Sequence, residues 1–188
     1  MPFAATSIPG VIVFEPAVYL DDRGFFFESY NKKLFHANHI LNEFVQDNQS
    51  FSAFGVIRGL HYQREPYAQS KLVRVLSGRI LDVVVDIRAG SPSFGKSFGI
   101  ELNSENKKQL FIPRGFAHGF SVLSETAEIS YKCDQFYHKQ SESGIRYNDG
   151  HLNIDWQIPR EKALISDKDA ALPEFNPFLT DFTYNKNG

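Results

Sequence analysis

Apolar residues in this chain recur mostly with a period of two, in short runs rich in β-branched residues that Gly, Pro, Asn and Ser interrupt. No long helical stretch separates these runs, so parallel strands joined by helical crossovers are not expected. Many short strands joined by turns favour a sandwich or barrel, and we favour a jelly roll. The runs predicted as strands are 10–15, 24–30, 55–63, 70–76, 79–88, 98–102, 109–112, 119–123 and 127–133.

Helical patterns are confined to the edges of this predicted β core. Residues 31–40 place apolar side chains at 34, 35 and 37, which predicts one short helix. A second helix is expected to begin at SDKD, where Ser166 can cap the N-terminus and Asp169 can complete a capping box. Both helices should be peripheral. Residues 183–188 are expected to form a frayed chain end.

The composition indicates the class of protein. A length of 188 residues predicts a single domain over residues 1–188. The formal net charge of -2 does not indicate the basic surface that nucleic-acid binding requires. The single cysteine, Cys133, excludes an internal disulfide and favours a reducing compartment. The N-terminus lacks a basic leader, and no run approaches the length of a membrane span. We therefore expect a cytoplasmic protein without membrane contact.

Alternation turns two polar side chains toward the predicted core. In AEISYKC it places Tyr131 on the same face as Ile129 and Cys133. In SKLVRV it places Lys71 on the side of Val73, where a lysine needs a partner or a shifted pKa. The alternatives are a packed tyrosine that bonds a backbone carbonyl and a lysine at the frayed start of a strand.

The stretch RGLHYQ places an arginine and a histidine inside a predicted buried strand. Arg58 and His61 differ in parity, so a regular strand would direct them to opposite faces. Gly59 lies between them, and a glycine inside a strand often marks a bulge. One extra residue at a bulge would bring both side chains to the same face. A regular strand would exclude a shared site.

The stretch FIPRGFAHGF contains the spacing P-x-G-x-x-H, which ends at His118 and resembles the second signature of the cupin superfamily. Metal-binding cupins carry H-x-H followed by Glu in their first signature. The corresponding place here reads His61-Tyr62-Gln63, and glutamine is a poor ligand for a transition metal. With Glu65 nearby, a facial triad for iron is the alternative, but proton chemistry is favoured and no metal is expected.

Eight motifs together resemble the dTDP-4-dehydrorhamnose 3,5-epimerase family, the metal-free cupins of dTDP-rhamnose synthesis. They cover nearly the whole chain in order. The resemblance implies a jelly-roll homodimer that acts on a dTDP-sugar without a cofactor. The motifs are DDRGFFFESYN, FVQDN, VIRGLHYQ, KLVRVLSG, DVVVDIRAGSPSFGK, FIPRGFAHGF, ISYKC and LISDKDAALP.

The resemblance also implies catalytic roles. His61 would be the general base that removes the proton next to the C4 ketone, and Asp169 would orient and charge-stabilise its imidazole. Lys71 would stabilise the enolate oxygen, and Tyr131 would return a proton from the opposite face. The chemistry agrees with these residue types, because a base alone is too weak for a carbon next to a ketone unless the enolate is also stabilised.

The family pattern further implies residues that line the diphosphate, sugar and thymine subsites. Arginine suits the diphosphate because its guanidinium donates two parallel hydrogen bonds. Without the family, an exposed ion pair on an edge strand and an ordinary polar turn are the alternatives for the first members of the set. The set is Arg23, Glu28, Gln46, Asp47, Asn48, Arg58, His118, Glu142 and Lys168, with Phe26 and Tyr137 as aromatic neighbours of the thymine or sugar.

The sequence leaves further functions open. Related enzymes with the same base and acid epimerise only C3, and no residue in this chain excludes that outcome. A metal-dependent cupin and a non-catalytic sugar-binding jelly roll are also compatible with the sequence. The chain departs from the family at Phe136-Tyr137, where many members carry two tyrosines, and this loss of one hydroxyl should not affect the chemical step.

Overall fold

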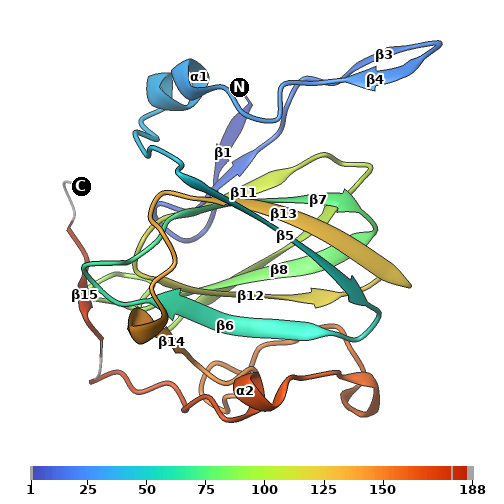
Figure 1. The fold of residues 1–188 in the computed structure, drawn as a ribbon. Coiled ribbons are helices and arrows are strands. Elements are labelled where there is room, and N and C mark those ends of the chain that lie inside the picture. Colours follow the sequence, from blue (N-terminus) through green and yellow to red (C-terminus); the bar gives the residue numbers. More distant parts are fainter. Residues whose placement is uncertain (1, 179, 186–188) are drawn as a thin grey trace.

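In a computed structural model that describes residues 2–178 and 180–185, two antiparallel sheets face each other across the core (Figure 1). One sheet has six strands in the order β1 (Phe3–Ala5), β2 (Ile12–Phe14), β11 (Gln109–Ile112), β7 (Lys71–Ser77), β13 (Thr126–Cys133) and β5 (Gln46–Ala53). The other has five, in the order β10 (Ser97–Asn103), β8 (Arg79–Asp86), β12 (Phe116–Val122), β6 (Ile57–Gln63) and β14 (Glu142–Gly144).

The space between the sheets is filled by apolar side chains from both of them. Val73 and Ile129 come from the six-stranded sheet, Val84 and Phe120 from the five-stranded sheet, and all four are buried. Burial of this kind stabilises a domain by about 25 cal/mol for each Å² of apolar surface removed from water. The closed core therefore holds the strands that carry the polar residues of the site.

Both sheets are also covered on their outer faces. Val83 and Val85 point outward from β8 and pack with Trp156 and other residues of the C-terminal half. Burial on both faces explains why β8 carries apolar side chains at consecutive positions, in Ile80–Leu81 and in Val83–Val85. On the six-stranded sheet, Phe35 of α1 (Lys32–Ala37) packs against Leu72 and its neighbours.

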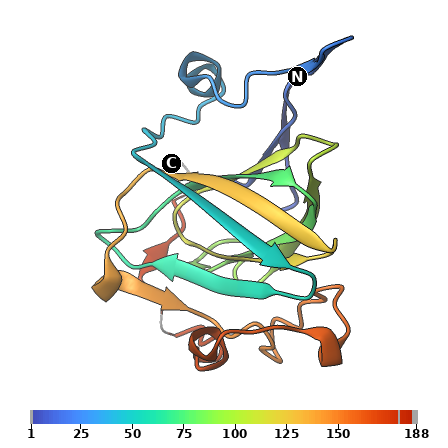
Figure 2. The ribbon, with the colours of Figure 1, turned by 45° about the vertical axis from the view of Figure 1, so that its right-hand side comes forward.

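Smaller elements surround these sheets. The hairpin of β3 (Tyr19–Asp21) and β4 (Gly24–Phe26) projects away from the barrel (Figures 1 and 2). Strand β9 (Arg88–Ala89) pairs in parallel with β15 (Phe182–Thr183). The remaining elements are α2 (Asp167–Ala170) and 3₁₀ helices over Lys139–Ser141 and Arg160–Lys162.

The prediction of an all-β jelly roll with short peripheral helices is confirmed. Each predicted strand overlaps an observed one, although the predicted strand 24–30 ends at Phe26. The predicted frayed end is wrong at Thr183, which lies in β15, whereas residues 186–188 lie outside the described residues. None of the helices in the described part of the chain has the length and apolar character that crossing a bilayer requires.

Candidate active site

A cavity of about 390 Å³ lies between the two sheets, closed on one side by α2. Its apolar wall includes Val56, Ile57 and Phe120. Polar side chains from both sheets and from the α2 region complete the lining. They are Ser50, Arg58, His61, Lys71, His118, Tyr131, Ser166, Lys168 and Asp169.

A bulge in β6 brings Arg58 and His61 into this cavity together. His61 pairs with His118 of β12, and Arg58 pairs with Phe120, so β6 carries one extra residue between the two pairs. Gly59 at the bulge has a φ of +136°, and a Cβ there would lie 2.5 Å from the Cα of Gly119. Only glycine fits this position. The predicted bulge and the shared face are confirmed.

His61 is held by the buried carboxylate of Asp169. Nε2 of His61 lies 2.8 Å from Oδ1 of Asp169, and the backbone N–H of Gly59 donates to Oδ2 at 3.1 Å. Burial alone would raise the pKa of Asp169, but hydrogen bonding to His61 and Gly59 outweighs it and lowers this pKa. The ionised carboxylate therefore favours a proton on Nε2 and leaves Nδ1 of neutral His61 as the basic nitrogen.

Two roles were possible for Asp169 at the N-terminus of α2: completing the helix cap or holding His61. Ser166 caps the helix, because its Oγ accepts from the backbone N–H of Asp169 at 3.1 Å. The Asp169 carboxylate does not complete a capping box, since both of its oxygens are taken by His61 and Gly59. The cap prediction is confirmed for Ser166 and wrong for Asp169.

A second histidine, His118, lies beside Lys71. Nε2 of His118 contacts both oxygens of Asp82 at 3.0 and 3.1 Å, and Nζ of Lys71 is 3.5 Å from Nδ1. Burial lowers the pKa of His118, so its ring stays neutral and can accept a hydrogen bond from Lys71. Burial also lowers the pKa of Lys71, and this outweighs the attraction of the carboxylates of Asp82 and Glu142. The inward orientation predicted for Lys71 is confirmed.

Tyr131 faces the cavity from the six-stranded sheet, opposite the sheet that carries His61. It shares a face of β13 with buried Ile129 and Cys133, as alternation predicts. Burial raises the pKa of Tyr131, so the phenol keeps its proton at neutral pH. Nζ of Lys71, which comes from the neighbouring strand β7 of the same sheet, lies 6.0 Å from the centre of the Tyr131 ring.

The mouth of the cavity carries a cluster of linked polar groups. Lys168 donates to Oε1 of Glu142 at 2.6 Å, and the hydroxyl of Tyr137 donates to Oε2 at 2.9 Å. Burial alone would raise the pKa of Glu142, but these hydrogen bonds outweigh it and lower this pKa. Gln46 accepts from the backbone N–H of Tyr137 at 2.9 Å, and its amide bonds Asn48.

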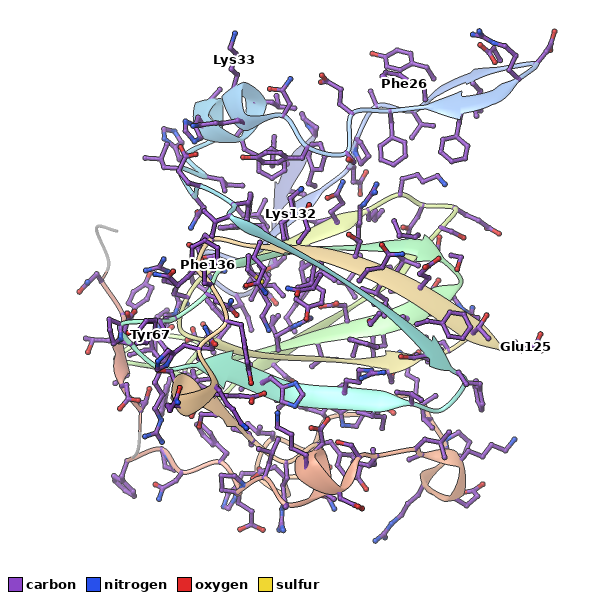
Figure 3. The ribbon with its side chains drawn as sticks, in the orientation of Figure 1. Phe26, Lys33, Tyr67, Glu125, Lys132 and Phe136 are labelled. Carbon is purple, nitrogen blue, oxygen red and sulfur yellow. The ribbon has the colours of Figure 1, made fainter. Side chains whose placement is uncertain are left out.

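Eight residues of the predicted set do not line the cavity. Four of them, Gln46, Asn48, Tyr137 and Glu142, form the cluster described above, and the other four lie elsewhere. Arg23 and Phe26 belong to the exposed hairpin, and Arg23 bonds Asp21 on the same hairpin. Glu28 is exposed and bonds Asn31. Asp47 lies on the opposite face of β5 from Asn48 and pairs with Lys132 at 2.9 Å. Figure 3 shows Phe26 far from the barrel and Lys132 on its outer side.

Sequence reasoning missed several residues that line the cavity or hold the side chains that line it. Asp82, which holds His118, stands in a run that reads as ordinary buried strand. Ser50 lines the cavity and Ser52 accepts from Nε of Arg58 at 3.2 Å. Both serines follow Asn48 at a spacing of two, so extending the alternation of QDN through QSFSA would have identified them.

The geometry bears on the metal alternative. Within residues 2–178 and 180–185, no three His, Cys, Asp or Glu side chains converge in a way that would hold a metal ion. Both ring nitrogens of His118 contact other side chains, and the amide of Gln63 bonds the backbone of Tyr67, Phe136 and His138. The cavity instead brings together the side chains of a histidine, a lysine and a tyrosine, His61, Lys71 and Tyr131.

Comparison with known proteins gives consistent matches over nearly the whole chain. The model of the dTDP-4-dehydrorhamnose 3,5-epimerase family matches residues 5–177. A dTDP-4-dehydrorhamnose 3,5-epimerase of Shigella flexneri is 57% identical over 87% of this chain and 90% of its own length.

Solved structures agree with these sequence matches. A Legionella pneumophila dTDP-6-deoxy-D-glucose-3,5-epimerase, in complex with dTDP-4-keto-L-rhamnose, superimposes with a TM-score of 0.91 at 46% identity, covering 97% of this chain and 98% of that one. The 3'-monoepimerase ChmJ of Streptomyces bikiniensis gives a TM-score of 0.83 at 31% identity, covering 90% and 85%.

Proposed function

The chain belongs to the dTDP-4-dehydrorhamnose 3,5-epimerase family, and we propose that it inverts C3 and C5 of dTDP-4-dehydro-6-deoxy-D-glucose to give dTDP-4-dehydro-L-rhamnose. This reaction belongs to dTDP-L-rhamnose synthesis. One observation carries the proposal: His61 and Tyr131 line one cavity from opposite sheets, and Lys71 lines the same cavity. A base and an acid on opposite sides of a sugar ring are what inversion of a carbon requires.

The proposed first step is deprotonation next to the C4 ketone. Nδ1 of His61 takes the proton, while Asp169 on Nε2 stabilises the imidazolium that forms. The electron pair moves into the enolate, whose oxygen lies by the ammonium of Lys71. Removing one fixed donor from such an oxyanion typically slows a reaction by about 10²- to 10³-fold.

The proposed second step is reprotonation from the other side. The phenol of Tyr131 gives its proton to the carbon, and the enolate collapses to the ketone. The phenolate then regains a proton from solvent and the His61 imidazolium releases its proton to solvent, so the base and the acid are both restored. The same two steps at the other carbon complete the reaction. The base, the cation and the acid are all side chains of this chain, so the proposal invokes no metal or cofactor.

We propose that the dTDP part of the substrate is bound at the mouth of the cavity. Arg58, Lys168 and Glu142 lie there, and guanidinium and ammonium groups suit a diphosphate. We further propose a homodimer, because Arg23 and the exposed Phe26 lie on a hairpin that projects away from its own barrel (Figure 1).

Epimerisation of C3 alone is the second candidate. It is favoured by the similar fold of the 3'-monoepimerase from Streptomyces bikiniensis, whose TM-score with this chain is 0.83. The relatives named as 3,5-epimerases are more similar in sequence, at 57% and 46% identity against 31%. Double epimerisation is therefore the proposal.

The test is turnover of dTDP-4-keto-6-deoxyglucose in D2O by metal-stripped protein, with deuterium at C3 and C5 read by NMR. Deuterium at both carbons is expected, and His61→Ala should remove it with a loss of at least about 10³-fold in rate. His151→Ala is the matched control, because this histidine side chain is 82% exposed.

Three other outcomes would change the conclusion. Deuterium at C3 alone would establish a 3-epimerase, and activity that returns only with added metal would establish a metal-dependent cupin. Binding of the nucleotide-sugar without exchange at either carbon would establish a binding protein.

A further inference from the structure

Residues 135–138, which follow β13, are held by glutamine side chains. Gln69 donates to the carbonyl of residue 135 at 2.7 Å, and Gln46 accepts from the N–H of residue 137 at 2.9 Å. Gln63 bonds both the carbonyl of residue 136 and the N–H of residue 138. We call residues 135–138 the clamped segment. The backbone of this segment is held by hydrogen bonds to glutamine side chains, whereas the backbone of a strand is held by hydrogen bonds to a neighbouring strand.

Gln63 makes the most contacts of the three glutamines. Its side chain is buried, with 5% of the residue exposed. Nε2 donates to the carbonyls of Tyr67 at 2.6 Å and Phe136 at 3.3 Å, and Oε1 accepts from the N–H of His138 at 2.6 Å. The rings of Tyr67 and His138 stack with centroids 3.8 Å apart. Figure 3 shows Tyr67 and Phe136 at the same end of the barrel.

The clamped segment connects to the cavity through Tyr137, which lies between Phe136 and His138, the two residues of the segment that Gln63 bonds. The hydroxyl of Tyr137 donates to Glu142 at 2.9 Å, and Glu142 accepts from Lys168 at 2.6 Å. Lys168 lines the cavity. Glu142 is also the pairing partner of Gln63 between β14 and β6. Gln63 is thus linked to the cavity wall through the backbone of the clamped segment and then through the hydrogen bonds of Tyr137 and Glu142.

We propose that Gln63 is a positioning residue for nucleotide-sugar binding, which acts by fixing the clamped segment and, through Tyr137 and Glu142, the ammonium of Lys168. The inference rests on the proposed function. It gives a role to the residue that stands where metal-binding cupins place a second histidine. In this chain that strand position orders the mouth of the cavity.

The effect should fall on binding more than on the chemical step. His61 is held by Asp169 and Gly59, and Tyr131 is fixed within β13, so neither depends on the clamped segment. Loss of the Gln63 contacts should therefore loosen Tyr137 and Lys168 and leave the base and the acid in place.

The experiment compares Gln63→Glu and Gln63→Met with wild type by steady-state kinetics and by calorimetric titration with dTDP. A carboxylate keeps the acceptor for the N–H of His138 but cannot donate to the carbonyls of Tyr67 and Phe136. Both variants should raise KM and the Kd of dTDP about tenfold, with kcat within about twofold, as expected for losing buried hydrogen bonds. Gln49→Met is the matched control, since Gln49 is exposed and its side-chain amide donates to Glu128 on the neighbouring strand.

A double-mutant cycle with Tyr137→Phe distinguishes positioning from a general loss of stability. Without the Tyr137 hydroxyl, Gln63→Met should cost much less than tenfold in dTDP affinity, because the link to Glu142 is already broken. Additive losses would overturn the proposal. So would an unchanged Kd for dTDP, or a kcat that falls as far as KM rises.

If the Gln63 variants do not fold, Gln69→Leu decides. It removes a single contact to the same segment and should raise the Kd of dTDP a few-fold; an unchanged Kd would overturn the proposal. The wild type separates this inference from the proposed function. Wild-type protein that binds dTDP but exchanges no deuterium would refute the epimerase proposal and leave the dTDP measurement for Gln63 valid.

Discussion

The cavity and the β3–β4 hairpin hold predicted site residues in opposite ways. In the cavity, His61 and Lys71 are each fixed by a neighbour, Asp169 or His118, and each comes from a strand within a sheet. On the hairpin, the Arg23 side chain is 89% exposed and Phe26 is 66% exposed. The proposed proton-transfer groups therefore all lie within one barrel, whereas Arg23 and Phe26 lie on a hairpin that projects away from it.

The strongest test of the cavity as a complete proton-transfer site is Tyr131→Phe. His61 should still remove the C3 proton and return deuterium to the same face, so label should enter recovered substrate. Inversion should slow by about 10²- to 10⁴-fold, because the acid on the opposite sheet is lost. NMR of both substrate and product in D2O measures the two outcomes.

Tyr147→Phe is the matched control for this substitution, since Tyr147 packs against the outer cluster of the five-stranded sheet. Normal inversion by Tyr131→Phe would assign the acid to another group. It would also break the claim that one barrel carries both sides of the reaction.

The next largest effect is expected at Lys71, whose pKa burial lowers from the ordinary value. A lowered pKa means that the ammonium loses its proton at a lower pH than a free lysine does. Activity should therefore fall on the alkaline side below pH 10.5, while Tyr131, whose pKa burial raises, is still protonated. The measurement is kcat against pH.

Substitutions of Lys71 identify the group responsible. Lys71→Met should reduce kcat by about 10²- to 10³-fold and remove the alkaline decline, because no ammonium is left to titrate. Lys71→Arg should move the decline to higher pH, since guanidinium stays charged. A decline unchanged in Lys71→Arg would show that another group titrates there.

The sequence predicts the interior of the barrel better than its mouth. Strict alternation in β7 and β13 orients Lys71 and Tyr131 correctly, because a half-buried strand has only two faces. Gly59 predicts the bulge of β6, since a glycine inside a strand signals a backbone distortion. These are local rules, and the site follows them where strands are regular or interrupted at one residue.

The parts that sequence does not predict depend on contacts between distant segments. Asp82 and His118 are 36 residues apart, and no local pattern shows that one holds the other. The local sequence correctly predicts that Ser166 caps the helix. The carboxylate of Asp169, predicted to complete the capping box, instead bonds His61, 108 residues away. The carboxylate of Asp169 bonds the partly exposed ring of His61 and the N–H of Gly59, and the helix end is capped by Ser166. Pairing across the fold therefore overrides the local rule.

A smaller effect is expected on the hairpin. Arg23→Ala should raise KM about tenfold with little change in kcat, as for loss of one charged contact to a phosphate. The subunit that uses Arg23 can be identified by mixing Arg23→Ala chains with His61→Ala chains after unfolding. If the hairpin serves the partner's cavity, mixed dimers contain one cavity with His61 and an intact Arg23, and low-KM activity returns.

Recovery of low-KM activity in the mixture would show that substrate binding needs residues of two chains, whereas the proposed proton transfer needs residues of one chain. Mixed dimers without recovery would show that each hairpin folds back onto its own cavity. A monomer by sedimentation would remove the dimer proposal altogether.

The smallest effect is expected at Asp47, although the family pattern places it in the binding site. Its carboxylate lies on the outer face of β5 and pairs with Lys132 at 2.9 Å, while Gln46 and Asn48 face the other way. The side chain of Asp47 is 65% exposed, and an exposed ion pair of this kind contributes little free energy. Asp47→Asn should therefore leave KM and kcat within about twofold of wild type, whereas Asn48→Ala should raise KM. A large effect of Asp47→Asn on KM or kcat would mean that the outer face of β5 contacts the substrate, and the proposed binding site would then extend beyond the cavity.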